Sequence, residues 1–168
     1  MSTVPDFASF YVAARPTLLR TTYAVTGDRQ LAEDAVQVAF AKAYASWSRV
    51  NRASDPTAYV RRIAINAAIG HHRRASFRRE TPVDRLPDRV ADPAPDLLER
   101  DEVWTAVRAL PPRQRAVVVL RYYEDLSERQ IADALGCRPG TVKSQAAAAL
   151  ATLRDRLGEL DPAEGDRA

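Results

Sequence analysis

The apolar residues near the start of the chain recur at intervals of three and four, which places them on one face of a helix. The first such face comprises Phe7, Phe10, Tyr11, Ala14 and Leu18. Thr26-Gly27-Asp28 is expected to end this helix, because glycine accepts a left-handed backbone and Asp28 can cap the next helix. The second helix is expected to turn four residues toward a core: Leu31, Ala35, Val38 and Tyr44. It also carries large or polar side chains that need not all point inward: Asp34, Gln37, Phe40 and Trp47.

A third helix is predicted to begin after Asp55, with Pro56 in the first turn, where its missing N–H is not needed. This helix ends in the basic run His71-His72-Arg73-Arg74, and basic side chains in a last turn complement the helix dipole. The unit carries more arginines than that compensation requires, which favours contact with phosphates over a merely solvated helix end. These arginines are Arg61, Arg62, Arg73 and Arg74.

Proline marks the boundary between two helical units. Four of the eleven prolines lie close together among aspartates: Pro82, Pro87, Pro93 and Pro95. Residues 76–96 are therefore predicted to form an extended linker between a first domain, 1–75, and a second, 97–158, which an acidic tail, 159–168, follows. With only six glycines and much Ala, Leu and Arg, the chain is expected to be all-α.

The second unit is expected to begin with an amphipathic helix carrying Leu97, Leu98, Val103, Trp104 and Val107. Leu110-Pro111-Pro112 should break that helix, and Val117, Val118, Leu120 and Tyr122 should continue in another.

The strongest motif is LSERQIADALGCRPGTVKS, residues 126–144. Ser127 and Gln130 fit a capping box, which fixes a helix start, and Gly136 can form the tight turn between two crossed helices. Small Ala132 suits a close crossing, and Pro139 suits the first turn of the second helix. The pattern predicts a helix-turn-helix.

In such a motif the second helix is the one that enters the major groove of DNA. Its outward residues near the start are Arg138, Thr141, Lys143, Ser144 and Gln145. Gln can pair with adenine edges, Lys with guanine, and Arg or Thr with phosphates. The alternative is a pair of packed helices with no role in DNA binding.

The net charge of +3 conceals two basic segments that are separated by an acidic one. Residues 51–80 carry seven arginines against Asp55 and Glu80, and residues 106–157 carry nine basic against five acidic side chains. Residues 81–105 carry three basic against seven acidic side chains. Two contacts with a polyanion, joined by a segment that avoids it, would produce this pattern, although a mixed surface charge would too.

The composition argues against most enzyme classes and against a metal site or a cofactor. Cys137 is the single cysteine, and the only two histidines are adjacent and so point to different faces of a helix. Neither a signal peptide nor an apolar run of about 20 residues is evident, so a cytoplasmic protein is expected.

Both units together resemble a bacterial RNA polymerase sigma factor of the extracytoplasmic-function type. Residues 31–47, LAEDAVQVAFAKAYASW, resemble the helix that binds the clamp of the polymerase large subunit. Residues 58–74, AYVRRIAINAAIGHHRR, resemble the helix that melts and reads the minus-ten promoter element. Residues 110–145 resemble the domain that binds the minus-thirty-five element, and the three stretches occur in the order of that family.

The resemblance implies partners and residue roles. It implies core polymerase and promoter DNA as partners, and an anti-sigma protein as a further one, with no catalysis and no membrane insertion. Contacts with core polymerase are implied for Asp34, Gln37, Phe40 and Trp47, and contacts with the unwound strand for Arg61, Arg62 and Asn66, beside Tyr59 and the loop 51–55. Contacts with the upstream element are implied for Arg121, Lys143 and Ser144.

The chain also departs from the family pattern. Ala148 stands where an arginine is common, so the run Ala146–Ala149 leaves the recognition helix bare beyond Gln145, and Gly70 stands where an acidic residue is frequent. Two further functions remain open at this point: a helix-turn-helix regulator that acts without polymerase, and a protein-interaction module with a vestigial helix-turn-helix.

Overall fold

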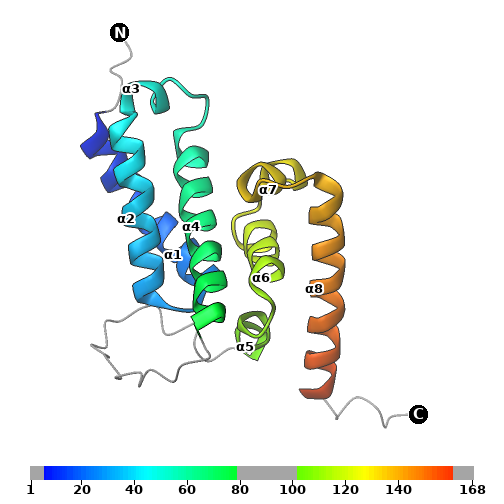
Figure 1. Ribbon diagram of the computed structural model, residues 1–168. Coiled ribbons are helices and arrows are strands. Elements are labelled where there is room, and N and C mark those ends of the chain that lie inside the picture. The colour runs from blue at the N-terminus through cyan, green and yellow to red at the C-terminus, as the bar shows by residue number, and fades with distance from the viewer. Residues whose placement is uncertain (1–5, 79–101, 161–168) are drawn as a thin grey trace.

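The computed structural model describes residues 6–78 and 102–160, and within these ranges the chain is helical with no strand (Figure 1). The first unit contains α1 (Phe7–Thr26), α2 (Arg29–Ala45), α3 (Trp47–Val50) and α4 (Pro56–Arg78). The second unit contains α5 (Glu102–Arg108), α6 (Pro112–Val118), the π-helix η1 (Val119–Tyr123), α7 (Glu128–Leu135) and α8 (Pro139–Leu160). The all-α fold is therefore confirmed.

The helices begin where the sequence places caps. The Asp28 carboxylate accepts a hydrogen bond from the Leu31 amide at 3.0 Å, and Asp55 accepts one from Ala58 at 2.9 Å. Gly27 closes α1 in the left-handed conformation at φ 67°, which a side chain would disfavour. These bonds satisfy amides that have no partner inside their own helix.

Two boundaries differ from the predicted ones. α4 continues through Arg78, so residues 76–78 of the predicted linker are helical, and α8 extends to Leu160. The short helix α3 and the π-helix η1 were not predicted. The rest of the predicted linker, Leu97, Leu98 and most of the acidic tail lie outside the described residues.

The first unit is a bundle in which α2 packs against both α1 and α4. The buried face of α2 is made largely of small residues: Ala32, Ala35, Val36, Ala39, Phe40 and Ala43. The predicted inward orientation of Val38 and Tyr44 is wrong, since they are 43% and 68% exposed. The small alanines on this face allow α2 to pack closely against α4.

The second unit contains the predicted helix-turn-helix. Ser127 Oγ accepts from the Gln130 amide at 3.2 Å, and Gln130 Oε1 accepts from the Ser127 amide at 2.8 Å, which completes the capping box. Gly136 ends α7 at φ 63°, and α8 begins at Pro139. α8 packs against α5, α6 and α7 through Val142, Ala149 and Leu153, among other buried residues.

The two units share one hydrophobic core instead of standing apart. Val25 of α1 and Ile65 and Ile69 of α4 lie in the same buried cluster as Val117 and Leu120 of the second unit. α4 packs beside α6 and α7, whereas α8 lies on the far side of the second unit (Figure 1). This close packing of the units was not predicted.

No helix in ranges 6–78 and 102–160 is both long enough and apolar enough to span a membrane.

Candidate nucleic-acid interface

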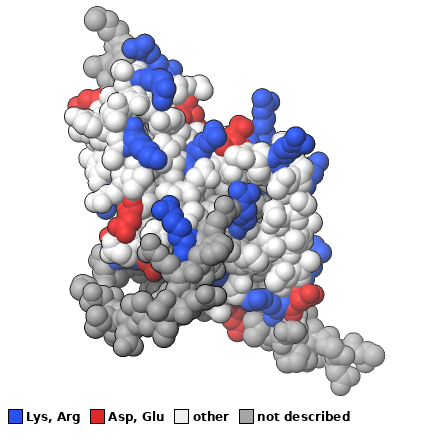
Figure 2. All heavy atoms as spheres, in the orientation of Figure 1, with Lys and Arg blue, Asp and Glu red and all other residues white. Residues whose placement is uncertain are grey.

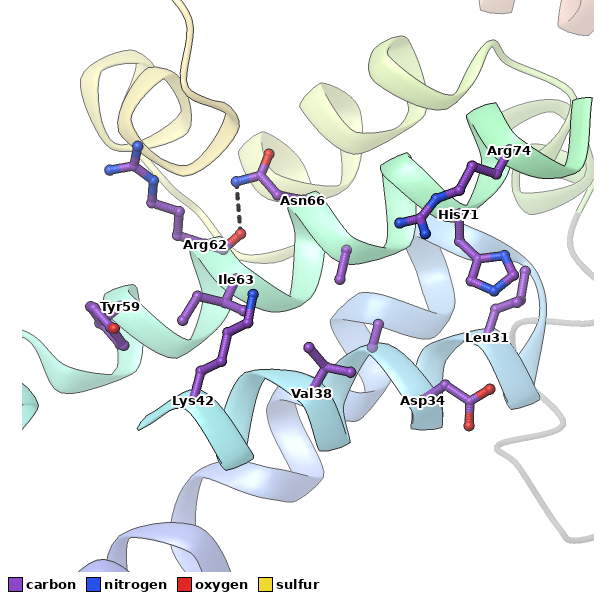
Figure 3. A pocket seen from close by; sticks show the side chains of 12 residues that line it. Leu31, Asp34, Val38, Lys42, Tyr59, Arg62, Ile63, Asn66, His71 and Arg74 are labelled. Carbon is purple, nitrogen blue, oxygen red and sulfur yellow. Dashed lines mark hydrogen bonds between the residues drawn. The ribbon is translucent and has the colours of Figure 1, made fainter. Parts of the chain in front are cut away.

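A groove of about 690 Å³ runs between α2 and α4 on the surface of the first unit (Figure 3). Its floor is apolar, and its rim is largely basic and polar. It is lined by Leu31, Asp34, Ala35, Val38, Lys42, Tyr59, Arg62, Ile63, Asn66, Ala67, His71 and Arg74. The groove brings together five residues for which the sequence analysis expected contacts with polymerase or DNA: Asp34, Tyr59, Arg62, Asn66 and Arg74.

The rim combines positive charge with one aromatic ring. Lys42 of α2 reaches toward α4, and Arg74 and His71 lie near the other end of the groove (Figure 3). Arg62 and Arg74 are exposed, and Tyr59 is half-buried. Cationic side chains beside an aromatic surface suit a single nucleic-acid strand, whose phosphates need charge and whose bases need a stacking face. Figure 2 shows that basic side chains are spread over both units on one face of the molecule.

Asn66 lies where α4 meets the second unit. Its Nδ2 donates to the Arg62 carbonyl at 2.8 Å and to the Ala134 carbonyl of α7 at 3.0 Å. Arg61, one residue before Arg62, faces the second unit instead of the groove, and its Nη2 lies 4.0 Å from Glu124 Oε2. Two predicted DNA-contacting residues are thus held by the second unit.

The residues predicted to contact polymerase do not form one exposed surface. Asp34 and Gln37 are exposed on α2, and Asp34 Oδ1 accepts from Gln30 at 2.9 Å. Phe40, for which a polymerase contact was expected, is only 3% exposed, and its ring centroid lies 4.7 Å from that of Tyr11. Trp47 is half-buried, with its ring 5.0 Å from that of Phe10. Aromatic rings of α1 pack against both side chains, which keeps them out of an exposed contact surface.

The recognition helix α8 presents the predicted outward residues, although not all to the same degree. Arg138, Lys143 and Ser144 are exposed, whereas Thr141 and Gln145 are half-buried. Lys143 Nζ lies 3.8 Å from Glu128 Oε1, and the Ser144 hydroxyl donates to the Thr141 carbonyl at 3.0 Å. A base or phosphate would have to compete with both contacts.

The alanine run has two different faces. Ala146 and Ala149 are buried in the core of the second unit, whereas Ala147 and Ala148 are exposed. Only the latter pair therefore leaves the exposed side of α8 without longer side chains.

The remaining basic residues are distributed as follows. Arg121 is exposed in η1, with its guanidinium 5.8 Å from the ring centroid of Tyr122. The side chain of Arg73 lies outside the described residues. Cys137 is half-buried in the turn of the helix-turn-helix. Among the described residues, no group of three His, Cys, Asp or Glu side chains could hold a metal ion.

Sequence reasoning missed three residues at these surfaces. Lys42 lines the groove, and its position in the last turn of α2 was the available signal. Glu124 and Arg115 connect the two units, and no sequence signal marked them, because their partners lie about a hundred residues away in the chain.

Two families match the chain, and they cover nearly all of the described residues. Sigma-70 region 2 matches residues 10–78, and Sigma-70, region 4 matches residues 100–153. The groove lies within the first match and the helix-turn-helix within the second.

Curated relatives extend the similarity over most of the chain. The RNA polymerase sigma-E factor of Streptomyces antibioticus is 37% identical over 159 residues, which cover 94% of this chain and 88% of that protein. The ECF RNA polymerase sigma factor SigL of Mycobacterium tuberculosis is 34% identical over 152 residues, which cover 85% of this chain and 84% of SigL.

Solved structures share the fold at lower identity. The sigma factor RpoE of Bartonella quintana, in complex with the anti-sigma factor NepR, gives a TM-score of 0.70 at 22% identity and covers 91% of this chain and 97% of its own. CnrH, in complex with the cytosolic domain of CnrY, gives 0.58 at 18% identity and covers 91% of this chain and 88% of its own. With both regions matched in order and relatives similar over nearly their full length, this chain belongs to the ECF RNA polymerase sigma factors.

Proposed function

We propose that this sigma factor binds core RNA polymerase in the cytoplasm and directs it to promoters through two separate DNA contacts. The first unit contacts polymerase and the unwound minus-ten strand, and the second binds the minus-thirty-five duplex. The chain supplies recognition and no catalysis of its own. One observation carries the proposal: both proposed DNA-contacting surfaces lie within the matched sigma-70 regions. These surfaces are the basic groove of α2 and α4 and the exposed start of α8.

The two helices that form the groove suit different partners: α2 suits a protein surface and α4 suits phosphates. Asp34 and Gln37 are exposed on α2 and present hydrogen-bonding groups to a protein surface. Arg62 and Arg74 are exposed on α4 and present cations to phosphates. A strand that lies along α4 would therefore be held close to the point where α2 meets polymerase.

The second unit binds duplex DNA through the N-terminal part of α8. Arg138, Lys143 and Ser144 are exposed there, and Arg121 of η1 adds a further cation. This arrangement fits a helix whose first turns enter the major groove while neighbouring basic residues hold phosphates.

An anti-sigma protein is a further proposed partner. RpoE and CnrH were solved with NepR and CnrY respectively, and this chain shares their fold. A protein that covered the groove of α2 and α4 would block polymerase and the unwound strand together.

Variants that separate the two contacts test the proposal. Asp34→Arg should weaken binding to purified core polymerase and leave binding of the free chain to duplex DNA unchanged. Lys143→Ala should weaken binding of the free chain to duplex DNA and leave binding to core polymerase unchanged. Asp155→Arg, at an exposed site near the end of α8, is the control for the charge change of Asp34→Arg. Failure of the unaltered chain to bind core polymerase at modest salt would leave a generic DNA-binding protein.

A further inference from the structure

Lysine is rare in this chain, and both lysines lie on the surfaces proposed to contact nucleic acid. Of the 25 basic side chains, 23 are arginines, and the other two are Lys42 and Lys143. An arginine guanidinium keeps its charge in proteins, whereas the ε-amine of a lysine can be acylated and so made neutral. Among the side chains of the whole sequence these two positions alone carry an amine, so acylation can remove charge only there.

Both ε-amines are accessible to a reagent in solution. Lys42 is exposed on α2, and its side chain reaches across the groove toward α4 (Figure 3). The side chain of Lys143 is 72% exposed on α8, the recognition helix. One lysine therefore lies in each unit, and each lies on one of the two surfaces proposed to contact promoter DNA.

The groove around Lys42 can accommodate a longer side chain that carries no charge. Val38, one turn earlier on α2, is 43% exposed, and Ile63 of α4 lines the same groove. A charged amine keeps its end in water, whereas an acylated lysine has no charge and can lie along this apolar floor. The acyl group would then occupy space that a nucleotide of the strand needs.

Acylation of Lys42 also changes the charge on the α2 side of the groove. Among the described residues that line the groove, α2 contributes two charged side chains, Asp34 and Lys42. Loss of the Lys42 charge leaves the Asp34 carboxylate as the charged group on this side, opposite Arg62 and Arg74 of α4. A carboxylate repels phosphates, so the modified groove should hold a single strand less tightly.

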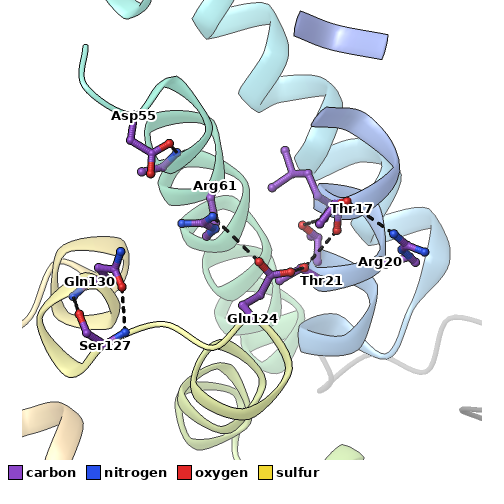
Figure 4. A network of polar contacts seen from close by, with 11 residues as sticks. Thr17, Arg20, Thr21, Asp55, Arg61, Glu124, Ser127 and Gln130 are labelled. Atoms are coloured by element: carbon purple, nitrogen blue, oxygen red, sulfur yellow. Dashed lines mark hydrogen bonds and ion pairs between the residues drawn. The ribbon is translucent and has the colours of Figure 1, made fainter. Parts of the chain in front are cut away.

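Lys143 lies beside an acidic partner whose position is fixed by the helix-turn-helix. Glu128 is the first residue of α7 and follows Ser127, whose capping box with Gln130 fixes the start of that helix (Figure 4). Glu128 Oε1 lies 3.8 Å from Lys143 Nζ, and the Glu128 side chain is 30% exposed. In the unmodified protein the two side chains therefore form a pair with no net charge.

Acylation of Lys143 turns this neutral pair into a single negative charge at the start of the recognition helix. The acylated nitrogen is an uncharged amide, so the Glu128 carboxylate loses its cationic partner. Because duplex DNA presents phosphates to this surface, an uncompensated carboxylate there opposes binding. Arg138, five residues earlier, is exposed and keeps its charge, so the modification should weaken duplex binding without abolishing it.

We propose that Lys42 and Lys143 are acylation sites, and that acylation weakens the strand contact of the first unit and the duplex contact of the second. The reagent is an activated acyl donor, either an acyl phosphate or an acyl thioester. The unprotonated ε-amine attacks the acyl carbon and forms the C–N bond of an amide, while the C–O bond to phosphate or the C–S bond to sulfur breaks. The leaving group departs with the bonding electron pair, and the nitrogen releases its extra proton to water. The inference rests on the proposed function, since it takes the groove and α8 as contacts with promoter DNA.

Treatment of the purified full chain with an acyl donor tests whether the folded protein reacts at these positions. Acetyl phosphate and acetyl coenzyme A are used in separate arms, and peptide mass mapping locates the acetyl groups. We expect Lys42 and Lys143 to be acetylated in the folded chain as fully as in the chain unfolded in urea, and the arm that reacts identifies the donor. Protection of either lysine in the folded chain would overturn the assignment of that lysine, and reaction with neither donor would overturn both.

The effect of treatment on affinity is compared between the unaltered chain and two variants that each lack one amine. Lys42→Arg and Lys143→Arg keep the charge and cannot be acylated at the altered position, so each variant is the control for the other. At about 0.1 M salt, one phosphate contact corresponds to about eightfold in affinity for a duplex and about fivefold for a single strand. Treatment of the unaltered chain should therefore reduce duplex affinity by about eightfold, and Lys143→Arg should remove this response while Lys42→Arg retains it.

The single-strand contact is tested in the same way with a labelled oligonucleotide of about 12 nucleotides. Treatment should reduce its affinity by about fivefold, and here Lys42→Arg should remove the response. An unchanged affinity of the treated unaltered chain, or an equal loss in the variant that lacks the relevant amine, would refute the role of that lysine.

Glu128→Gln separates the charge effect at Lys143 from a distortion of α8. This variant restores a pair with no net charge after acylation, so the treated Glu128→Gln chain should bind duplex about as tightly as the untreated, unaltered chain. A duplex affinity that remains about eightfold lower would contradict the charge argument, because it would show that the acyl group acts by its bulk.

The chain isolated from the cells that produce it tests whether the modification occurs there. Peptide mass mapping should find an acyl group on a fraction of Lys42 or Lys143 in exponential or stationary growth, and its absence at both stages would refute the proposal. If the unaltered chain does not bind core polymerase, the proposed function fails, whereas the donor reactions and the duplex measurements on the free chain still test this inference.

Discussion

Replacing Ala148 by arginine tests whether the recognition helix has a bare surface where DNA phosphates would lie. Ala148 is exposed and lies four residues after Ser144, so the two side chains are neighbours on one face of α8. The buried alanines of the run, Ala146 and Ala149, are not affected by this change. An arginine at 148 would therefore extend the basic face that begins at Arg138, with little effect on the core.

The expected magnitude follows from counterion release. Each additional phosphate contact steepens the dependence of log affinity on log salt concentration by about 0.9 for duplex DNA. Between about 50 and 200 mM salt, one extra contact multiplies the loss of affinity by about 3.5. The variant should therefore bind more tightly at low salt and lose that advantage as the salt concentration rises.

Fluorescence anisotropy with the full chain and a labelled duplex of mixed sequence measures this slope. Ala8→Arg is the matched control, since it adds the same charge at an exposed site of α1, on the opposite side of the molecule from α8 (Figure 1). The reasoning fails if Ala148→Arg leaves the slope unchanged. It fails equally if Ala8→Arg steepens the slope as much, because net charge alone would then explain the effect.

Three further predictions concern stability. Ser127→Ala removes half of the capping box and should destabilise the fold by about 1 kcal/mol in urea unfolding, whereas Ser46→Ala, where no side-chain cap bond exists, should not. Ala132→Leu overfills the crossing of α7 and α8 and should cost about 1–3 kcal/mol; a smaller loss than for exposed Ala147→Leu would contradict this. The hydrogen bond from the Ser9 amide lowers the pKa of Asp6 below its ordinary 3.8. The ionised Asp6 carboxylate therefore stabilises the fold fully above pH 3.8, and this stabilisation is lost as the pH falls through the lowered pKa. Trp47 fluorescence in a Trp104→Phe background should show that acid transition at the start of α1, and Asp6→Asn should abolish it.

The parts of the fold that follow from local rules could be predicted from the sequence. Caps at Asp28 and Ser127 and the left-handed glycines depend on neighbouring residues alone, and each lies where it was expected. Helix-turn-helix geometry is equally local, because a capping box and one glycine determine it.

Residue orientation within α2 could not be predicted in the same way. Its apolar residues are compatible with more than one inward stripe, and the choice depends on how closely α1 and α4 approach. The alanines permit that close approach, so Phe40 turns inward among the rings of α1, while Tyr44 stays 68% exposed with its ring centroid 4.9 Å from that of Phe7. The contact between the units could not be predicted either, because it too depends on residues that are distant in the chain. Glu124 and Arg115 look like ordinary surface charges until their distant partners are known.

The position of α8 has a consequence for how the free protein meets the chromosome. Because α8 packs on α5, α6 and α7, its outward residues stay accessible while the two units are in contact. Nonspecific duplex binding needs only such cations, and it allows a protein to slide and hop along DNA. We expect the exposed start of α8 to bring the free protein onto the chromosome by such nonspecific contacts before polymerase arrives.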